Sequence, residues 1–315
     1  MNSYGERFRV TTYGESHGPA VGAVIDGCPA GVALDMDAIQ HQLERRRYGA
    51  PRQEGDEVEW LSGLKDGVTL GTPLAFLIRN HAAQPEAYDH LEHLFRPGHA
   101  DYTYYMKYGL RDHRGGGRSS ARETVSRVVA GAIASQLMPE VTITTQEESV
   151  PIVDNDTMGG IVACRMEGVP AGLGEPIFGK LNAQLAAAMM SIPSAIGFEM
   201  GVGFEAARMK GSEYIDRWSK ENGEQLLASA SSQFTPLTVT NHCGGIQGGI
   251  SNGMPIEFRV AFHPVVSIPQ PVECMDEKGR LETVSIGGRH DRYHIHRAAV
   301  VVEAMAALCL INNML

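Results

Sequence analysis

The spacing of apolar residues in the first part of the chain predicts two strands followed by a helix. Residues 8–13 and 20–26 are rich in β-branched side chains and bracket the glycine-flanked stretch 14–18, a pattern typical of strand, tight turn and strand. Residues 34–47 instead have the pattern of an amphipathic helix. The apolar side chains on one face of this helix are Leu34, Ile39 and Leu43.

Two further helices and another strand are predicted later in the chain. Apolar side chains recur at helical spacing after Ser119 and Ser120 and continue through Leu137. The strand-like run 257–268 reads EFRVAFHPVVSI. Residues 297–315 are apolar nearly all round, which predicts a helix buried in the core or in a subunit contact.

The second half of the chain repeats a pattern of the first half. Residues 167–172 (EGVPAG) match residues 26–31 (DGCPAG), and each copy follows a strand-like run and precedes a helix. A repeat of this length is typical of a duplicated half-domain. Because clean βαβ units are few, we predict an α+β fold with antiparallel sheets. We expect one domain, 1–315, with halves of about 1–148 and 149–315 related by a pseudo-twofold axis.

The composition is that of a globular chain. Its 315 residues, 43% hydrophobic and 20% charged, can bury one large core or two smaller ones. The five cysteines are far apart and never in C-x-x-C spacing, so neither a disulfide framework nor a structural zinc site is predicted. Because polar residues follow Met1, we expect a soluble, cytoplasmic protein with no membrane partner.

Basic residues gather in one stretch, 96–127, although the net charge of the chain is −10. An acidic chain repels a polyanion, so this stretch is not a generic nucleic-acid surface. It contains the triple glycine Gly115–Gly117 just before a predicted helix, and such a turn can offer backbone N–H groups to a small anion. The alternative is a flexible turn with a capping serine. A Walker loop is excluded because no G-K-[ST] follows the glycines.

A second group of arginines ends the helix predicted at 34–47. Four arginines fall within residues 45–52, more than a helix C-terminus needs to complement its dipole. Guanidinium groups suit carboxylate and phosphate oxygens, so this run is a candidate substrate site, with a solvated helix end as the alternative. The glycine-rich residues 240–253 indicate either backbone packed against a flat ring or a long loop.

A histidine cluster raises the alternative of a metal-dependent phosphate-ester hydrolase. His294 and His296 would share one face of an extended strand, and His290 and Asp291 stand beside them. Against this alternative, the stretch 96–127 offers arginines where a two-metal enzyme has carboxylates. We therefore predict no bound metal.

The stretch 96–127 closely resembles the chorismate synthase family, whose pattern RPGHAD, KYG and RD-x-RGGGRSSARET stands here almost letter for letter. The resemblance covers nearly the whole chain. It implies a lyase of the shikimate pathway of aromatic amino acid biosynthesis, which converts 5-enolpyruvylshikimate 3-phosphate to chorismate and phosphate by 1,4-elimination. It also implies reduced FMN (FMNH2) as cofactor, long helices sandwiched between sheets, and a homotetramer. NADPH or a separate flavin reductase would supply the reduced flavin.

The resemblance implies roles for individual residues. His17 matches the histidine on the phosphate side, and His99 the histidine that protonates the reduced flavin. Asp291 matches the carboxylate near the flavin nitrogen that receives the ring proton. Ser16 and Ser120 match the serines that position it. The arginines assigned to the substrate are Arg45, Arg46, Arg52 and Arg122. The residues assigned to the flavin are Arg118, Ser119, Ser120, Pro193, Ser194, Gly248, His263, Pro264, Val265, Val266, Ser267 and Arg289.

Some positions depart from the family pattern. The usual K-P-T-S-S is His-Pro-Val-Val-Ser at 263–267, which loses a lysine and hydroxyls expected near the flavin. The usual P-C after Asp291 is Arg-Tyr, and the region 140–160 looks shortened. A non-catalytic flavin- or anion-binding paralogue is therefore a further alternative. Retention of all three implied catalytic residues favours an enzyme.

Overall fold

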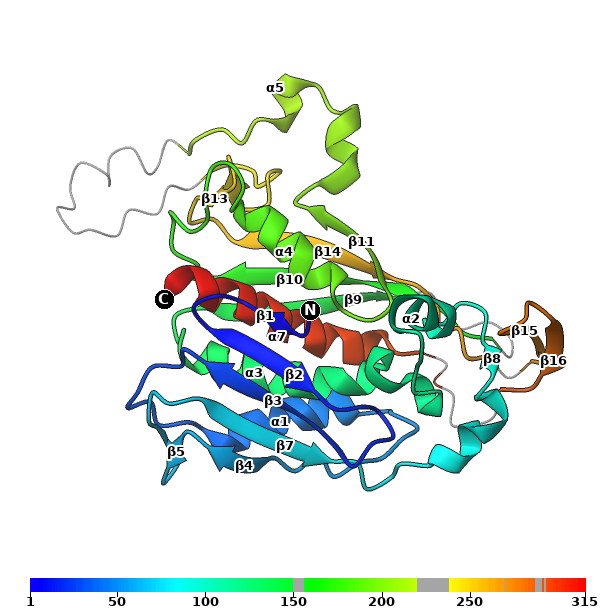
Figure 1. Ribbon diagram of the computed structural model, residues 1–315. Coiled ribbons are helices and arrows are strands. Elements are labelled where there is room, and N and C mark those ends of the chain that lie inside the picture. The colour runs from blue at the N-terminus through cyan, green and yellow to red at the C-terminus, as the bar shows by residue number, and fades with distance from the viewer. Residues whose placement is uncertain (150–155, 220–237, 269, 287–290, 292) are drawn as a thin grey trace.

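Two antiparallel sheets enclose a layer of helices (Figure 1). The computed structural model describes residues 1–149, 156–219, 238–268, 270–286, 291 and 293–315. The first sheet runs β1-β2-β3-β7-β4, with bounds Ser3–Tyr4, Arg9–Tyr13, Ala20–Asp26, Leu74–Arg79 and Glu59–Ser62. The second runs β11-β14-β10-β9, with bounds Ala195–Met200, Ile256–Phe262, Gly160–Glu167 and Thr142–Ser149.

The helices between the sheets hold the core together. They are α1 (Met36–Arg47), α3 (Thr124–Gln136), α4 (Leu181–Met190) and α7 (Ile295–Met314). Helix α3 packs on β2 and β3, α7 packs on β9 and β10, and the two helices pack on each other, which forms one continuous core. The predicted α+β class, with long helices between antiparallel sheets, is confirmed.

Helix α7 is largely buried in the sandwich. It is long and apolar enough to cross a membrane, but 78% of its apolar window is buried inside the fold, as in the core helix of a soluble protein. Its acidic residue, Glu303, accepts hydrogen bonds from Arg45 (2.6 and 2.9 Å) and from the hydroxyl of Thr145 (2.6 Å). The charge that interrupts this apolar helix is therefore paired, as a buried carboxylate requires.

The predicted boundaries hold where local signals are strong. Asp35 caps α1 by accepting from the N–H of Ala38 (2.9 Å), so the helix starts two residues after the predicted Leu34. The strand predicted at 257–268 ends early, because β14 stops at Phe262. The next N–H, that of His263, donates to Ser194 (3.0 Å), and Pro264 has no N–H to continue the ladder.

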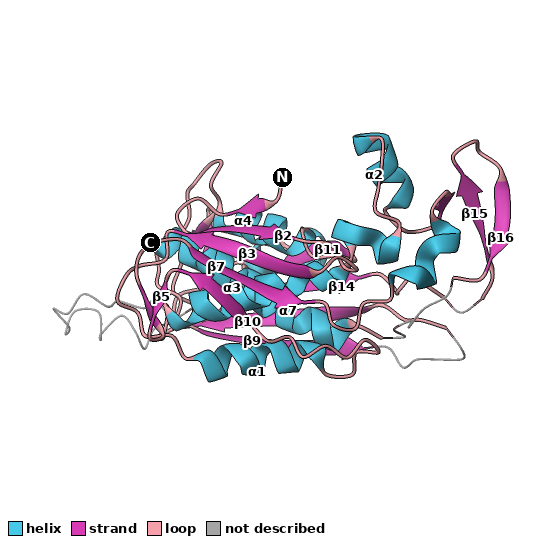
Figure 2. Cartoon of the chain, turned by 60° about the horizontal axis from the view of Figure 1, so that its bottom comes forward, coloured by secondary structure: helices cyan, strands magenta, loops and turns pink. Residues whose placement is uncertain are grey.

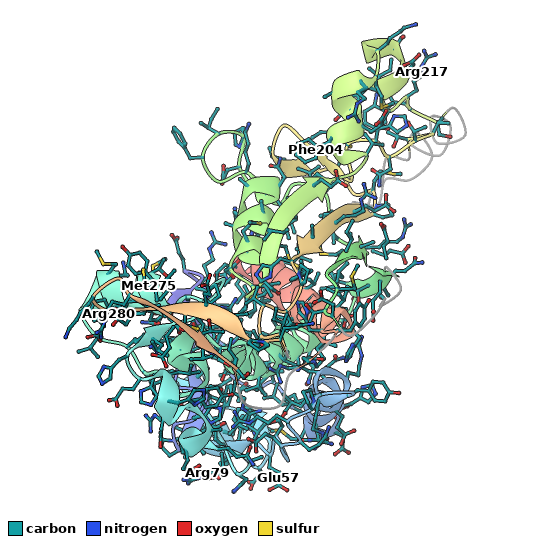
Figure 3. The ribbon with its side chains drawn as sticks, turned by 90° about the vertical axis from the view of Figure 1, so that its right-hand side faces the viewer. Glu57, Arg79, Phe204, Arg217, Met275 and Arg280 are labelled. Atoms are coloured by element: carbon teal, nitrogen blue, oxygen red, sulfur yellow. The ribbon has the colours of Figure 1, made fainter. Side chains whose placement is uncertain are left out.

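Smaller elements project from the sandwich. The hairpins are β5-β6 (Leu64–Lys65, Val68–Thr69) and β12-β13 (Ile246–Gln247, Ile250–Ser251). At one end, α2 (Asp101–Tyr108) stands near a small sheet of β8 (Leu94–Phe95), β15 (Val272–Asp276) and β16 (Leu281–Val284) (Figure 2). Helices η4 (Gly203–Arg208) and α5 (Gly211–Tyr214) form an arm away from the β15-β16 hairpin (Figure 3). The remaining 3₁₀ helices are η1 (Pro85–Leu91), η2 (Arg114–Ser119) and η3 (Ala121–Glu123).

Candidate active site

The turn between β2 and β3 is tied to two distant segments. The side-chain amide of Asn80, at the end of β7, donates to the carbonyls of Glu15 (3.1 Å) and Gly18 (2.9 Å). The N–H of Ser16 donates to the carbonyl of Gly117 (3.1 Å), and Ser16 is buried. The turn is thus held between β7 and the triple glycine.

His17 lies in a cradle that only glycine at position 115 allows. Its Nδ1 accepts from the N–H of Gln84 (3.1 Å), and its ring meets Tyr88 edge-on, with centroids 4.9 Å apart. A Cβ on Gly115 would come within 2.5 Å of His17 Cδ2 and 2.6 Å of Nε2. Because Gly115 also has φ +62°, a side chain there would be strained as well as crowded.

The triple glycine forms a turn before α3. Gly115, Gly116 and Gly117 all have positive φ, and the hydroxyl of Ser119 donates to the carbonyl of Gly116 (2.7 Å). The long helix begins later than predicted, at Thr124. Ser120 instead caps the short helix η3, accepting weakly from the N–H of Arg122 (3.4 Å). Two short 3₁₀ helices therefore separate the glycines from α3.

Every arginine of the basic stretch lies within 3.8 Å of a carboxylate. The pairs are Arg96–Asp101, Arg111–Asp101, Arg114–Asp112, Arg118–Glu123, Arg122–Asp56 and Arg127–Glu123. Buried guanidinium groups need such partners because desolvation of an unpaired charge is costly. The positive charge left to a ligand is therefore smaller than the number of arginines indicates.

Arg122 and Arg46 are buried and hold the segments that surround the site. Arg122 pairs with Asp56 and donates to Asn80 Oδ1 (2.9 Å), so the residue that holds the β2-β3 turn is itself held. Arg46 donates to the hydroxyl of Thr124 (3.0 Å) and the carbonyl of Ala121 (2.8 Å). Burial lowers the pKa of Arg46 to about 10.

The other two arginines assigned to the substrate, Arg52 and Arg45, point to different parts of the fold. Arg52 donates to the carbonyl of Ser16 (2.8 Å) and pairs with Glu54 (2.6 Å), which places it against the β2-β3 turn. Arg45 points to α7 and forms the ion pair with Glu303. The structure thus places Arg52 against the β2-β3 turn and Arg122 against Asn80, which holds that turn. Arg46 instead binds η3 and the start of α3, and Arg45 faces α7.

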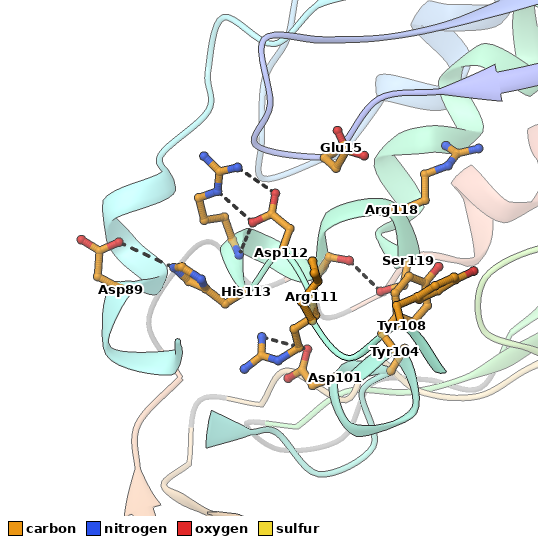
Figure 4. A pocket seen from close by; sticks show the side chains of 14 residues that line it. Glu15, Asp89, Asp101, Tyr104, Tyr108, Arg111, Asp112, His113, Arg118 and Ser119 are labelled. Carbon is orange, nitrogen blue, oxygen red and sulfur yellow. Dashed lines mark hydrogen bonds and ion pairs between the residues drawn. The ribbon is translucent and has the colours of Figure 1, made fainter. Parts of the chain in front are cut away.

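A cavity of about 840 Å³ opens beside the triple glycine (Figure 4). Its lining includes Tyr104 and Tyr108 from α2, together with Arg118 and Ser119. Arg118 donates to the carbonyl of Thr12 (2.9 Å), yet among the described residues its buried Nη1 has no hydrogen-bond partner. A volume of this size accommodates a mononucleotide or a drug-sized ligand. The cavity borders η2, against which His17 also packs.

His99, a residue of the first half, contacts the predicted flavin residues of the loop 263–267 in the second half. Its Nδ1 lies 3.0 Å from the carbonyl oxygen of Pro97, and its Nε2 lies 2.7 Å from the hydroxyl of Ser267. A Cβ on Gly98 would come within 3.0 Å of Val266, so the two loops are in close contact. The carbonyl of Val265 accepts from Thr157 (2.7 Å), and Pro264 accepts from the His263 ring (2.6 Å).

Asp291 and Ser194 both contact residues at the start of α7. Asp291 forms an ion pair with Arg297. Ser194, with φ +68°, hydrogen-bonds its hydroxyl to Nε2 of His294 (2.8 Å) and to the carbonyl of Pro193 (2.5 Å). Burial is the largest cause that lowers the pKa of His294 to about 4.

The histidine cluster is not assembled as a metal site among the described residues. There, no group of three or more metal-ligating side chains converges. Asp291 and His294 have the partners just given, and Nε2 of His296 donates to the carbonyl of Tyr48 (2.7 Å). The predicted positions His290 and Arg289 lie outside the described residues.

Gly248 lies apart from the other predicted flavin residues. With Gly249 it forms the two-residue turn of the β12-β13 hairpin, where both glycines have positive φ. Figure 1 shows β13 at the opposite end of the sandwich from α2. The tight turn requires the positive φ of Gly248 and Gly249, and the flavin contact assigned to Gly248 stays a prediction.

Several supporting residues escaped the sequence analysis. Asp56, Asn80 and Arg297 hold the site through side chains, and Gln84 does so through its backbone N–H. Asn80 and Gln84 lie in the loop that follows β7. No local pattern marks which distant residue each of them meets.

Comparisons with known proteins agree with this architecture. The profile of the family "Chorismate synthase" matches residues 8–155 and 151–315. Relatives of that name from Opitutus terrae and Porphyromonas gingivalis are 44% and 46% identical, covering 99% and 98% of this chain and 96% and 94% of their own length. A crystal structure of chorismate synthase, 28% identical, superposes with a TM-score of 0.74 over 99% of this chain and 92% of its own. The chain belongs to the chorismate synthase family.

Proposed function

We propose that the chain catalyses the reaction of its family, the 1,4-elimination of phosphate from 5-enolpyruvylshikimate 3-phosphate to give chorismate. The observation that carries this proposal is the meeting of three distant segments: Ser16 contacts Gly117, His17 contacts Gly115, and Arg52 contacts Ser16. The reaction breaks a C–O bond to phosphate and an unactivated C–H bond, so it needs charge neutralisation and proton transfer at defined positions.

The phosphate side is formed by the β2-β3 turn in this proposal. His17 donates a hydrogen bond to the leaving phosphate, and Arg52 adds positive charge next to it. Ser16 is held by Arg52, which supports a positioning role. Arg46 and Arg122 act indirectly, because both are buried: Arg122 binds Asn80, which holds the turn, and Arg46 binds the carbonyl of Ala121 in η3.

The proton side is formed by residues of both halves. Asp291 would stand near the flavin nitrogen that receives the ring proton, and His99 exchanges a proton with the cofactor. Ser120, capping η3, completes the proposed catalytic set. Arg45 remains a predicted substrate residue, although its side chain faces α7.

The described residues fit a flavin mononucleotide. The cavity of about 840 Å³ has two tyrosine rings. Nη1 of Arg118 makes no hydrogen bond among the described residues and lies 3.8 Å from Glu123, and it would meet an anionic group there. Arg118 and Ser119 would hold the cofactor from the first half. Ser194 and the loop 263–267 would hold it from the second. Reduced FMN, when bound, supplies the electron-rich ring that makes the unactivated C–H bond reactive.

The test is turnover of enolpyruvylshikimate phosphate with chemically reduced FMN under anaerobic conditions. We expect equal amounts of chorismate and phosphate, and no product with oxidised FMN alone. Phosphate release without flavin but with a divalent metal would instead establish the hydrolase alternative. Flavin binding without turnover would establish the non-catalytic paralogue.

Two variants test the histidine roles. His17→Ala and His99→Ala should each reduce turnover by about two to four orders of magnitude, the range for a lost acid, base or charge-stabilising donor. His41→Ala, an exposed position on α1, is the matched control and should behave as wild type. Circular dichroism checks that all three variants fold. Wild-type turnover in a folded His17→Ala or His99→Ala would contradict the assigned role.

We also propose a homotetramer located in the cytoplasm, with the flavin reduced by NADPH on the chain itself or by a separate reductase. The assembly is supported by exposed apolar side chains. Phe204 lies on the projecting arm (Figure 3), and Ile215 and Trp218 follow α5 in the chain. Such side chains commonly mark contact surfaces. Light scattering of the purified chain tests the assembly directly.

A further inference from the structure

One ring nitrogen of His17 has a partner that can play only one role. The N–H of Gln84 lies 3.1 Å from Nδ1, and a backbone N–H can only donate. Nδ1 must therefore carry a lone pair, so the neutral ring holds its proton on Nε2. An imidazolium would direct a second N–H at the N–H of Gln84, so this contact also disfavours the charged ring.

His99 has the opposite constraint. Its Nδ1 lies 3.0 Å from the carbonyl oxygen of Pro97, which can only accept, so Nδ1 carries the proton. Its Nε2 lies 2.7 Å from the hydroxyl of Ser267, which can either donate or accept. This geometry suits both the neutral ring and the imidazolium, because the hydroxyl can rotate when Nε2 gains a proton.

We propose that the chain fixes its two catalytic histidines in opposite tautomers and so separates their chemistry. His17 is held neutral with the proton on Nε2, and it acts as a hydrogen-bond donor. His99 is held with the proton on Nδ1 and takes up and releases a proton at Nε2, with Ser267 as its positioning residue. The tautomer assignment stands on geometry alone, while the chemical roles rest on the proposed function.

The packing around His17 keeps the assignment in place. Tyr88 meets the ring edge-on at 4.9 Å, and Gly115 fills the space beside Cδ2 and Nε2. Turning the ring over would take Nδ1 away from Gln84 and leave that N–H without this acceptor, which costs a hydrogen bond. The ring orientation therefore selects the tautomer.

The tautomers can be read directly from solid-state ¹⁵N NMR of the full chain labelled at the histidine rings. Protonated and unprotonated ring nitrogens resonate at well-separated shifts, and His17→Gln and His99→Gln identify each signal by its loss. At pH 7.5 we expect Nε2–H for His17 and Nδ1–H for His99. The same tautomer for both rings, or a protonated Nδ1 in His17, would overturn the proposal. This measurement needs no turnover, so it is independent of the proposed function.

Amide substitutions test the chemical division. The side-chain amide of glutamine reaches the position of Nε2, whereas that of asparagine reaches the position of Nδ1. His17→Gln should keep turnover within about tenfold of wild type, and His17→Asn should lose about two to four orders of magnitude, as His17→Ala does. His99→Gln should lose as much as His99→Ala, because an amide cannot exchange the proton. Equal losses in His17→Gln and His17→Asn would refute the donor role.

Ser267 is tested as a positioning residue. Ser267→Ala should leave the Nδ1–H tautomer of His99 unchanged, since Pro97 holds it, yet lower the turnover number at least about tenfold. Ser267→Thr keeps the hydroxyl and should restore most of the turnover, while FMN binding by the folded variants is measured as a control. A turnover number unaffected by Ser267→Ala, or no rescue by threonine, would exclude the hydroxyl from proton exchange.

Discussion

The corner around Thr69 in the first half has a counterpart around Ser251 in the second. The hydroxyl of Thr69 donates to Pro29 (2.6 Å) and accepts from the N–H of Val32 (2.9 Å). The hydroxyl of Ser251 makes the same two bonds at the same lengths, to Pro170 and from Leu173. Backbone bonds match too, because Gly31 donates to Thr69 (2.8 Å) and Gly172 donates to Ser251 (2.9 Å).

The hairpins that carry these hydroxyls also match. The turn of β5-β6 has positive φ at Asp66 and Gly67, and that of β12-β13 has positive φ at Gly248 and Gly249. Each turn also accepts a helix-side N–H, that of Leu34 at Gly67 (3.0 Å) and that of Leu181 at Gly249 (2.8 Å). We therefore propose that the halves of about 1–148 and 149–315 are copies of one unit.

The two halves differ more at the starts of α3 and α7 than at these corners. Before α3, Arg122, Arg46 and Arg118 tie the chain to neighbouring loops and strands. At the start of α7, the described contacts include the pair Asp291–Arg297 and the bonds from Ser194 to His294 and from His296 to Tyr48. If the halves are copies of one unit, the corner that folds each half is repeated, whereas the residues proposed for catalysis belong to loops that differ between the halves.

The largest expected effect comes from breaking the support of the first helix start. Asp56→Ala should lower the free energy of unfolding by about 3–5 kcal/mol, because it leaves the charge of Arg122 buried without its carboxylate. The side chains of Asp56 and Arg122 are only 2% and 6% exposed. Urea unfolding measures the loss.

Two control variants separate charge from conformation. Asp56 has φ +52°, which alanine tolerates poorly, whereas asparagine accepts it and keeps one oxygen. Asp56→Asn should therefore lose less than Asp56→Ala. Glu59→Ala breaks an exposed pair with Arg79 in the same half and should leave the unfolding midpoint nearly unchanged. If Asp56→Ala were as stable as Glu59→Ala, the buried pair would not hold this helix start.

The next largest effect is a pH dependence of the free energy of unfolding caused by His294 at the start of α7. Burial first, then the charges of His263 and His296, lower the pKa of His294 from 6.5 to about 4. The unfolded chain then binds the proton more readily, so this stability is present above pH 6.5 and is lost as pH falls from about 6.5 to 4. The loss should reach at most about 3 kcal/mol.

His294→Gln is the matched variant, since its amide can still meet Ser194. Phe262 and Ser194 contact the imidazole of His294, and neither titrates as an acid in this range. Urea unfolding at pH 7.5, 6 and 5 should show a steeper decline for wild type than for His294→Gln. Parallel declines would show that His294 is not the group responsible.

Sequence patterns predicted those parts of the fold that local signals define. The helices 34–47 and 297–315 were predictable because long amphipathic or apolar periods outweigh other tendencies, and observed α1 and α7 match them within about two residues. The strand 257–268 was overextended because β-propensity continues past Phe262 while the hydrogen-bond ladder does not.

The candidate site was predictable in its residue types but not in its contacts. The family pattern pointed to His17 and His99, yet their tautomers depend on Gln84 and Pro97, whose backbone groups carry no side-chain signal. Arginine density predicted ligand contacts, while partners such as Asp56 become neighbours only on folding. Tertiary proximity is what a single sequence does not encode in any local pattern.

The smallest expected effect sharpens the comparison of the two corners. Thr69→Val and Ser251→Ala each remove a buried hydroxyl and leave one N–H and one carbonyl without that partner, a loss of about 2 kcal/mol. If the halves are structural copies, the two losses in urea unfolding should agree within about 1 kcal/mol. The corners share no residue, so the double variant should lose the sum to within about 0.5 kcal/mol.

Each outcome of that measurement says something about the duplication. Equal, additive losses mean that each half relies on its own corner to the same degree, as two copies of a folding unit would. A large loss for Thr69→Val with none for Ser251→Ala would mean that the second corner keeps the shape of the first without its energetic role. The matched distances would then reflect backbone geometry imposed by the hairpin turns, and the copies would be equivalent in form but not in stability.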